Sequence, residues 1–158
     1  MNAHVPAAAV RRRAMLLGDL DAVAAIEASA YGFPWSRGNF VDALAAGHLA
    51  EVLEAGRPLG YFVALPGADE LHLLNITVAP HWQGRGLGTA LLEAVATHAR
   101  ERGLARVWLE VRASNVRAQA LYARRGYATV GCRRSYYPAA GAREDAVLMS
   151  LEVPAERA

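Results

Sequence analysis

The sequence contains a single cysteine, Cys132, among its 158 residues. One cysteine excludes an internal disulfide and provides no thiolate cluster for zinc, which is typical of proteins from a reducing cytoplasm. The chain also has no continuous apolar run of membrane-spanning length. Its first residues place a small apolar patch before Arg11, the reverse of the order in a secretory signal. We therefore expect a cytoplasmic protein.

Two familiar phosphate-binding motifs are absent as well. No Gly-Lys-Ser/Thr occurs, which excludes a nucleoside triphosphate P-loop, and Gly84, Gly86 and Gly88 lack the third-glycine spacing of the dinucleotide fingerprint. The formal net charge of +2 is too small to indicate a nucleic-acid partner. No metal site is predicted, because three histidines lack the spacing of metal ligands: His72, His81 and His98.

What the sequence does contain is an alternation of strand and helix patterns. Apolar and β-branched runs predict strands over residues 10–16, 48–55, 58–66, 70–80, 105–113, 127–137 and 144–153. Apolar residues at helical spacing, with Asp19 and Ser36 as caps of the first two helices, predict helices over residues 18–31, 33–47, 87–102 and 114–126. This order indicates a single α/β domain over residues 10–152, and we expect the alanine-rich residues 1–9 to be a disordered extension.

The stretch HWQGRGLGTALLEAV, residues 81–95, places three glycines at every second position before a predicted helix. A strand followed by a glycine-rich loop and a helix N-terminus forms an anion site, because the first helical amides lack partners and the helix dipole favours negative charge. We therefore predict a phosphate-bearing ligand. A glycine-rich turn without function is the alternative.

The loop matches the pattern Gln/Arg-x-x-Gly-x-Gly/Ala at Gln83, Gly86 and Gly88. This resembles the pyrophosphate loop of the GNAT family of N-acetyltransferases, which bind acetyl-CoA. The resemblance implies the GNAT fold, a mixed, mostly antiparallel central sheet of about seven strands flanked by about four helices. The resemblance also implies that the following residues bind acetyl-CoA: Ile76, Thr77, Val78, Gln83, Gly84, Arg85, Gly86, Leu87, Gly88, Thr89 and Asn115.

Five further segments narrow the resemblance to one branch of that family. They are FPWS at 33–36, WLEVRASN at 108–115, ALYARRGY at 120–127, RRSYYP at 133–138 and REDAVLM at 143–149. Together they resemble the ribosomal protein S18 alanine N-acetyltransferases, the RimI family. The resemblance implies acetyl transfer to the N-terminal alanine of S18 or to related N-termini, without a nucleic-acid or membrane partner. The alternatives are an acetyltransferase for lysine or small amines, and a non-catalytic acyl-CoA-binding module.

Glu110 is the candidate base. It alternates with Val107, Leu109 and Val111, so that a carboxylate is placed in an otherwise apolar strand. The pattern alone leaves two readings open: a proton acceptor, or one half of an ion pair with Arg112 or a neighbouring strand. The resemblance implies that Glu110 is the general base.

Tyr122 and Asn115 also have two readings each. The helical pattern predicts that Tyr122 packs its ring and leaves its hydroxyl at the surface, whereas the resemblance implies that it is the general acid. Asn115 either caps the helix or, by resemblance, contacts coenzyme A.

Three other features are weaker candidates. No histidine is placed by the sequence to activate Cys132, so we expect a small core or loop residue instead of a nucleophile. Trp35 and the pair Tyr136 and Tyr137 are candidates for the walls of an acceptor-peptide groove, with ordinary packing as the alternative.

Overall fold

The computed structural model describes residues 9–154. The strands are β1 (Arg11–Ala14), β2 (Leu49–Glu54), β3 (Pro58–Pro66), β4 (Glu70–Val78), β5 (Arg106–Arg112), β6 (Ala128–Tyr137) and β7 (Glu144–Glu152). The helices are α1 (Leu20–Ala30), α2 (Arg37–Ala45), α3 (Leu87–Glu101) and α4 (Val116–Arg124), with short 3-10 turns η2 (Leu17–Asp19) and η3 (Pro80–Trp82).

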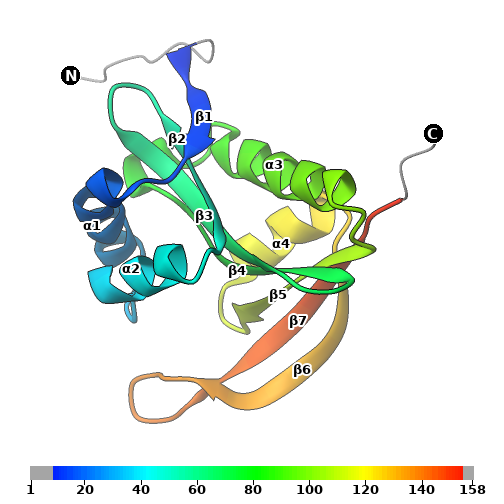
Figure 1. Ribbon diagram of the computed structural model, residues 1–158. Coiled ribbons are helices and arrows are strands. Elements are labelled where there is room, and N and C mark those ends of the chain that lie inside the picture. The colour runs from blue at the N-terminus through cyan, green and yellow to red at the C-terminus, as the bar shows by residue number, and fades with distance from the viewer. Residues whose placement is uncertain (1–8, 155–158) are drawn as a thin grey trace. The chain divides into compact units, whose positions relative to one another are not determined.

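The seven strands form a mixed sheet in the order β1-β2-β3-β4-β5-β7-β6 (Figure 1). β1 runs antiparallel to β2, β4 runs parallel to β5, and β7 runs antiparallel to both β5 and β6. The expected α/β fold, with its mixed sheet of seven strands and its four helices, is confirmed.

The described residues gather into two compact units. The first contains the residues up to Val63 together with Asn75–Leu91, and the second contains Ala64–Leu74 together with the residues from Leu92 onward. That residues 10–152 form a single domain stays a prediction. Residues 1–8 of the expected extension lie outside the described residues.

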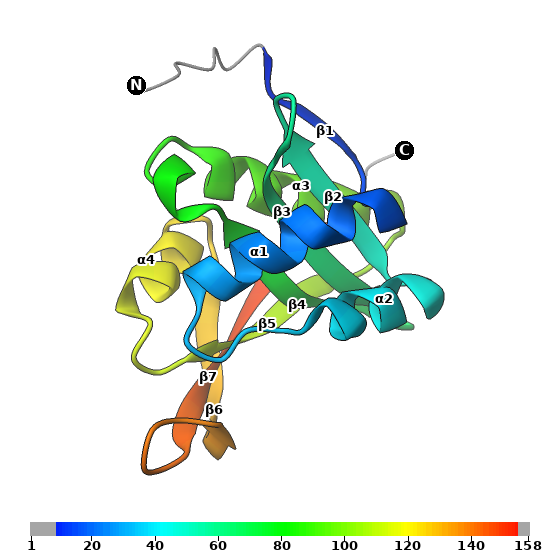
Figure 2. The ribbon, with the colours of Figure 1, turned by 90° about the vertical axis from the view of Figure 1, so that its left-hand side faces the viewer.

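The first unit packs α1 and α2 against its strands. Figure 2 shows α1 crossing the face of β2 and β3. Leu20 and Val23 of α1 and Phe40 of α2 are buried. Ser36 caps α2 as predicted, because its side chain accepts a hydrogen bond of 3.1 Å from the amide of Asn39.

Asp19 stands before α1 as expected, but its side chain does not cap that helix. Its carboxylate instead accepts two hydrogen bonds from Arg13, at 2.7 and 2.8 Å, and one of 2.8 Å from the amide of Leu16. A bidentate bond to a charged guanidinium is stronger than a bond to a helix amide. The tertiary contact therefore replaces the local cap.

The second unit is built on β5 and the long hairpin of β6 and β7 (Figure 1). The alternation predicted for β5 is observed, since Val107, Leu109 and Val111 are buried. Cys132 lies in β6 and is exposed, so the prediction of a core or loop position is wrong. Within residues 9–154, no helix is long and apolar enough to cross a bilayer.

Candidate functional site

The glycine loop of the first unit leads from η3 into α3. Gly84 and Gly86 have φ angles of 76° and 84°, in the left-handed region that side chains other than glycine disfavour. Gln83 ties the loop to the end of β4, because its side-chain amide donates a hydrogen bond of 3.1 Å to the carbonyl of Val78. The glycines are therefore required by the backbone path.

The amides of this loop form the positive end of α3. The first hydrogen bond of the helix runs from Ala90 N to Gly86 O at 3.1 Å, and in the described part of the chain no backbone carbonyl accepts from the amides of residues 84–89. Residues 83–86 are exposed, and the guanidinium of Arg85 lies 4.7 Å from the ring centre of Trp82. Exposed donors, a helix dipole and a cation together suit an anion such as a phosphate group.

The predicted coenzyme-binding strand, residues 76–78, turns its Thr77 side chain inward. The Thr77 hydroxyl lies 2.8 Å from both the Tyr31 hydroxyl and Asn75 Oδ1, and Thr77 is buried. The carbonyl of Ile76 accepts a hydrogen bond of 3.0 Å from Tyr31. Any coenzyme contact of this segment therefore uses backbone groups or the side chains of Ile76 and Val78, and such contacts stay a prediction.

Thr77 belongs to a buried polar network centred on Glu27 of α1. Oε1 of Glu27 accepts hydrogen bonds from the Tyr61 hydroxyl at 2.6 Å and from Asn75 at 3.0 Å, while Oε2 accepts from the amide of Trp35 at 3.0 Å. A buried carboxylate is tolerated when donors of this kind satisfy it. The network joins α1, β3, β4 and the FPWS segment. It was not predicted from the sequence.

In the second unit, Glu110 lies on β5 with its side chain 7% exposed. Oε1 of Glu110 lies 3.1 Å from Nε2 of His72 on β4. Among the described residues, Oε2 has no hydrogen-bond partner although it is buried. Arg112 pairs instead with Glu144 at 3.2 Å. Glu110 thus meets a residue of a neighbouring strand instead of Arg112. Because burial lowers the pKa of His72, the partner near pH 7 is a neutral ring and the contact is not an ion pair. The contact leaves Oε2 available.

Aromatic residues of β6 surround this carboxylate. Tyr136 and Tyr137 make an edge-to-face contact at 4.9 Å between ring centres. Interaction with the Glu110 carboxylate is the main cause that raises the pKa of Tyr136, and burial is the main cause that raises the pKa of Tyr137. Both phenols therefore stay protonated near neutral pH. Trp35, in contrast, packs on Phe40 with ring centres 5.1 Å apart.

Tyr122 and Asn115 both belong to α4 and its cap. Tyr122 is buried and its ring packs at 5.9 Å from that of Tyr127, so the packed ring is observed. Asn115 caps α4, because its Oδ1 accepts a hydrogen bond of 3.2 Å from the amide of Ala118. These contacts explain both residues structurally, and their catalytic and coenzyme-binding roles stay predictions.

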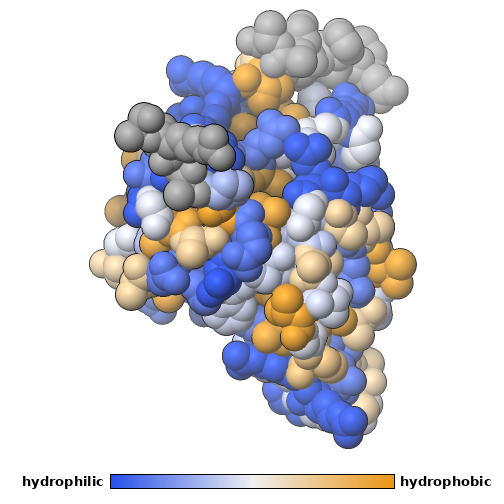
Figure 3. Space-filling view, turned by 90° about the vertical axis from the view of Figure 1, so that its right-hand side faces the viewer, coloured by the Kyte–Doolittle hydropathy of each residue, from blue (hydrophilic) through white to orange (hydrophobic). Residues whose placement is uncertain are grey.

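The tip of the β6–β7 hairpin, at the bottom of Figure 3, is largely hydrophilic. Its exposed arginines include Arg133, Arg134 and Arg143, and the last of these donates hydrogen bonds to the carbonyls of Ser135 and Tyr136. Part of this basic cluster therefore stabilises the turn of the hairpin.

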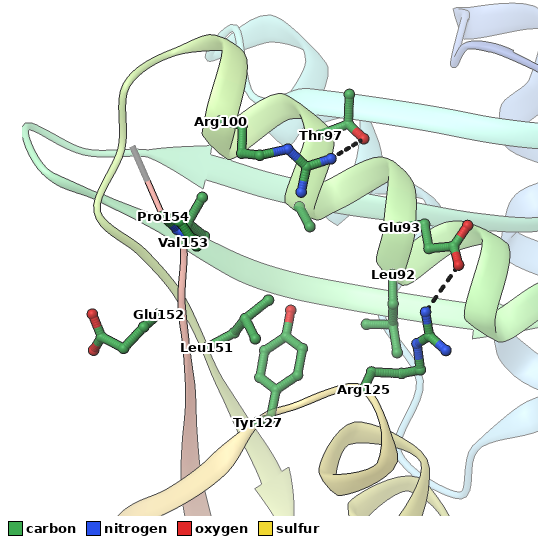
Figure 4. A pocket seen from close by; sticks show the side chains of 11 residues that line it. Leu92, Glu93, Thr97, Arg100, Arg125, Tyr127, Leu151, Glu152, Val153 and Pro154 are labelled. Atoms are coloured by element: carbon green, nitrogen blue, oxygen red, sulfur yellow. Dashed lines mark hydrogen bonds and ion pairs between the residues drawn. The ribbon is translucent and has the colours of Figure 1, made fainter. Parts of the chain in front are cut away.

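A pocket of about 380 Å³ opens elsewhere in the second unit. Figure 4 shows Tyr127 at its floor, with Arg100 hydrogen-bonded to Thr97 and Arg125 paired with Glu93 on its walls. None of the residues predicted from the sequence to act in catalysis or binding lines it. Within the described residues, no group of three histidine, cysteine, aspartate or glutamate side chains could hold a metal ion.

No role for His72, the neighbour of Glu110, was predicted from the sequence. The alternation along β4 indicated which face His72 lies on, because Leu71 and Leu73 are buried and His72 stands between them on the other face. What the alternation could not tell is which residue on the adjacent strand faces it.

Comparisons with known proteins agree with this geometry. Residues 20–127 match the model of the acetyltransferase (GNAT) family. The [ribosomal protein bS18]-alanine N-acetyltransferase of Escherichia coli K12 is 40% identical over 136 residues, which cover 85% of this chain and 92% of that protein. The enzyme of the same name from Haemophilus influenzae is 35% identical over 134 residues, covering 84% and 91%.

A solved structure gives the same result. The crystal structure of the ribosomal-protein-S18-alanine N-acetyltransferase from Escherichia coli superposes with a TM-score of 0.86 at 37% identity. The match covers 94% of this chain and 96% of that one.

Proposed function

The chain belongs to the acetyltransferase (GNAT) family, and on this premise we propose that it transfers acetyl from acetyl-CoA to the N-terminal alanine of ribosomal protein S18. The choice of S18 as the acceptor is supported by the 40% identity, over 85% of the chain, to an enzyme named for that acceptor. Three segments, FPWS, RRSYYP and REDAVLM, also support membership of the S18 alanine N-acetyltransferase branch of the family. Related N-termini are further acceptors, and the cytoplasm, where ribosomal proteins are made, is the proposed location.

The glycine loop is the proposed site for the pyrophosphate of acetyl-CoA. The amides of residues 84–89, at the N-terminus of α3, donate to no backbone carbonyl among the described residues and fit a phosphate in charge and in donor number. The backbone of Ile76–Val78 would bind the pantetheine arm, and Asn115 would contact the coenzyme. Acetyl-CoA supplies the acetyl group as an activated thioester.

Glu110 is the proposed general base. An α-amino group has a pKa near 7.7 to 8.0, so that about one-tenth is neutral at pH 7, whereas a lysine with a pKa near 10.4 is almost entirely protonated. An N-terminal acceptor therefore needs only a proton acceptor of modest strength, directly or through a water molecule. Oε2 of Glu110 is buried and has no hydrogen-bond partner within residues 9–154, which supports this role.

Tyr122 is the proposed general acid. The new N–C bond forms as the C–S bond breaks, the amine proton passes to Glu110, and the phenolic proton of Tyr122 passes to the departing thiolate. A buried phenol on a helix is suited to hold such a proton away from water. A non-catalytic acyl-CoA-binding module would have no need of this pair.

The test is acetyl transfer to a peptide that carries the N-terminus of S18 with its internal lysines. Products are read by mass, and the same peptide with a blocked N-terminus is the control. The 158 residues of the enzyme contain no lysine, so every acetyl-lysine detected comes from the peptide. Acetylation confined to the free α-amine is expected. Transfer to the lysines of the blocked peptide would favour a lysine acetyltransferase. Coenzyme binding without transfer would show that the acceptor or the catalytic assignment is wrong.

A further inference from the structure

His72 and Glu110 come together because β4 and β5 run parallel. The register places His72 beside Trp108, so that Glu110 lies two residues further along β5 on the same face. The side chains of His72 and Glu110 are 22% and 7% exposed, and Nε2 and Oε1 lie 3.1 Å apart. The pair is therefore shielded from water and is within hydrogen-bonding distance.

Trp108 restricts the imidazole ring of His72. The two rings stack with centres 3.6 Å apart and planes inclined by 8°. A stacked ring of this kind cannot rotate without losing that contact, so the Nε2 edge stays directed at Glu110. The stack thus defines which atom of His72 meets the carboxylate.

The charges that face His72 come from three strands. Burial lowers its pKa and is the largest cause, Arg133 of β6 lowers it further, and Glu110 of β5 and Glu70 of β4 raise it, with a net lowering. His72 is therefore neutral near pH 7, and a neutral imidazole can donate one N–H. The neighbouring phenols, Tyr136 and Tyr137, stay protonated at that pH.

We propose that His72 is a positioning residue for Glu110: it donates its Nε2–H to Oε1 and thereby leaves Oε2 oriented to accept the proton of the acceptor amine. The inference rests on the proposed function, in which Glu110 is the base. Burial of Oε2 with no donor from the described part of the chain is costly. This cost is explained if an amine or a water molecule of the reacting complex occupies that position.

The first arm of the test uses two substitutions of His72. His72→Leu removes the donor, and His72→Gln keeps an N–H donor that does not titrate. We expect His72→Leu to lower kcat roughly ten- to hundredfold, the effect of one hydrogen bond to a charged group, with KM for acetyl-CoA unchanged. His72→Gln should recover most of that loss, because its side-chain amide keeps an N–H donor. His98→Gln, on α3, is the matched control and should leave kcat unchanged.

A double substitution tests whether His72 acts through Glu110. In the Glu110→Gln background, His72→Leu should cause no further loss of kcat, because the base that it positions is already absent. Additive losses, or equal losses for His72→Leu and His72→Gln, would overturn the proposal.

An NMR titration separates this proposal from the proposed function. The imidazole signal of His72, assigned by its absence in His72→Gln, is followed against pH in the wild type and in Glu110→Gln. Because Glu110 raises the pKa of His72, the midpoint should move to lower pH in Glu110→Gln. An unchanged midpoint would refute the pairing even if the acceptor were correct. A shifted midpoint without S18 acetylation would refute the proposed function and leave the pairing of His72 with Glu110 intact.

Discussion

The hydroxyl of Tyr61 donates a hydrogen bond of 2.6 Å to Oε1 of Glu27 in the interior of the first unit. Burial, followed by the charge of Glu27, raises the pKa of Tyr61, so this phenol remains a donor. The same carboxylate accepts from the amide of Trp35, which lies in the FPWS segment. Glu27 therefore links this segment to β3, and removal of its donors should destabilise the unit.

Tyr61→Phe removes one donor from a buried carboxylate and keeps the ring. We expect the free energy of unfolding to fall by about 1.5–3 kcal/mol, the range for a hydrogen bond to a charged group. Urea denaturation measures it. The control is Tyr127→Phe, because the buried hydroxyl of Tyr127 has no hydrogen-bond partner among the described residues. Its loss should change stability little, and equal losses for the two variants would refute the role of the Glu27 network.

Asp19→Asn tests the ion pair between β1 and η2. Arg13 is the main cause that lowers the pKa of Asp19 in the folded chain. A carboxyl group with a lowered folded-state pKa stabilises the fold above its unfolded pKa of about 3.9, and this stabilisation disappears as the pH falls through the folded value. Asp19→Asn should therefore cost about 1–3 kcal/mol at pH 7, and the difference from the wild type should shrink steadily below about pH 4.

Denaturation curves recorded from pH 7 to pH 2 check this expectation. Asp21→Asn is the control, because the Asp21 side chain is 90% exposed although it pairs with Arg37 at 2.8 Å. An exposed pair of this kind contributes little. A difference for Asp19→Asn that stays constant over the whole range would contradict the pairing.

Gly86→Ala tests the loop before α3. Its φ of 84° is strained for alanine, and the same holds for Gly56, which has a φ of 75° in the turn between β2 and β3. Nothing lies within 4 Å of a Cβ atom added at either position. Both substitutions should therefore cost about 1–2 kcal/mol of stability, whereas only Gly86→Ala should weaken the binding of coenzyme A. Calorimetry measures that binding, and an equal effect of both variants on affinity would argue against the loop as the phosphate site.

Glu110→Gln tests the base. The amide has nearly the same shape but cannot accept the amine proton, so kcat should fall by about 10² to 10⁴ while the affinity for acetyl-CoA survives. Glu152→Gln, an exposed position at the end of β7, should leave kcat unchanged. Loss of coenzyme binding in Glu110→Gln would show instead that the residue holds the fold or the coenzyme.

Much of the fold could be predicted because its signals are local. Ser36 and Asn115 cap their helices as short polar side chains do at that position, and the glycine that ends α4, Gly126, has a φ of 97°. The burial of Val107 and Leu109 follows from the period of two along a strand. Such features depend on residues that are near one another in the chain.

Asp19 shows where local prediction fails. Its position before α1 is correct, but its carboxylate accepts hydrogen bonds from Arg13 of β1, and the helical pattern of α1 carries no information about that contact. The prediction for Cys132 is wrong for a related reason. The lack of an activating histidine suggested a small core or loop residue, yet β6 is an edge strand of the sheet and exposes the thiol.

The sequence by itself determined the order of the elements, the glycine loop before α3 and the place of Glu110 on a strand face. Only the tertiary structure decided what that carboxylate meets. The choice between Arg112 and a residue of another strand was open, because alternation along a strand specifies a face but no neighbour. The parallel register of β4 and β5, two segments distant in the chain, placed His72 opposite Trp108 and brought its Nε2 within 3.1 Å of Glu110, whereas Arg112 pairs with Glu144 of β7.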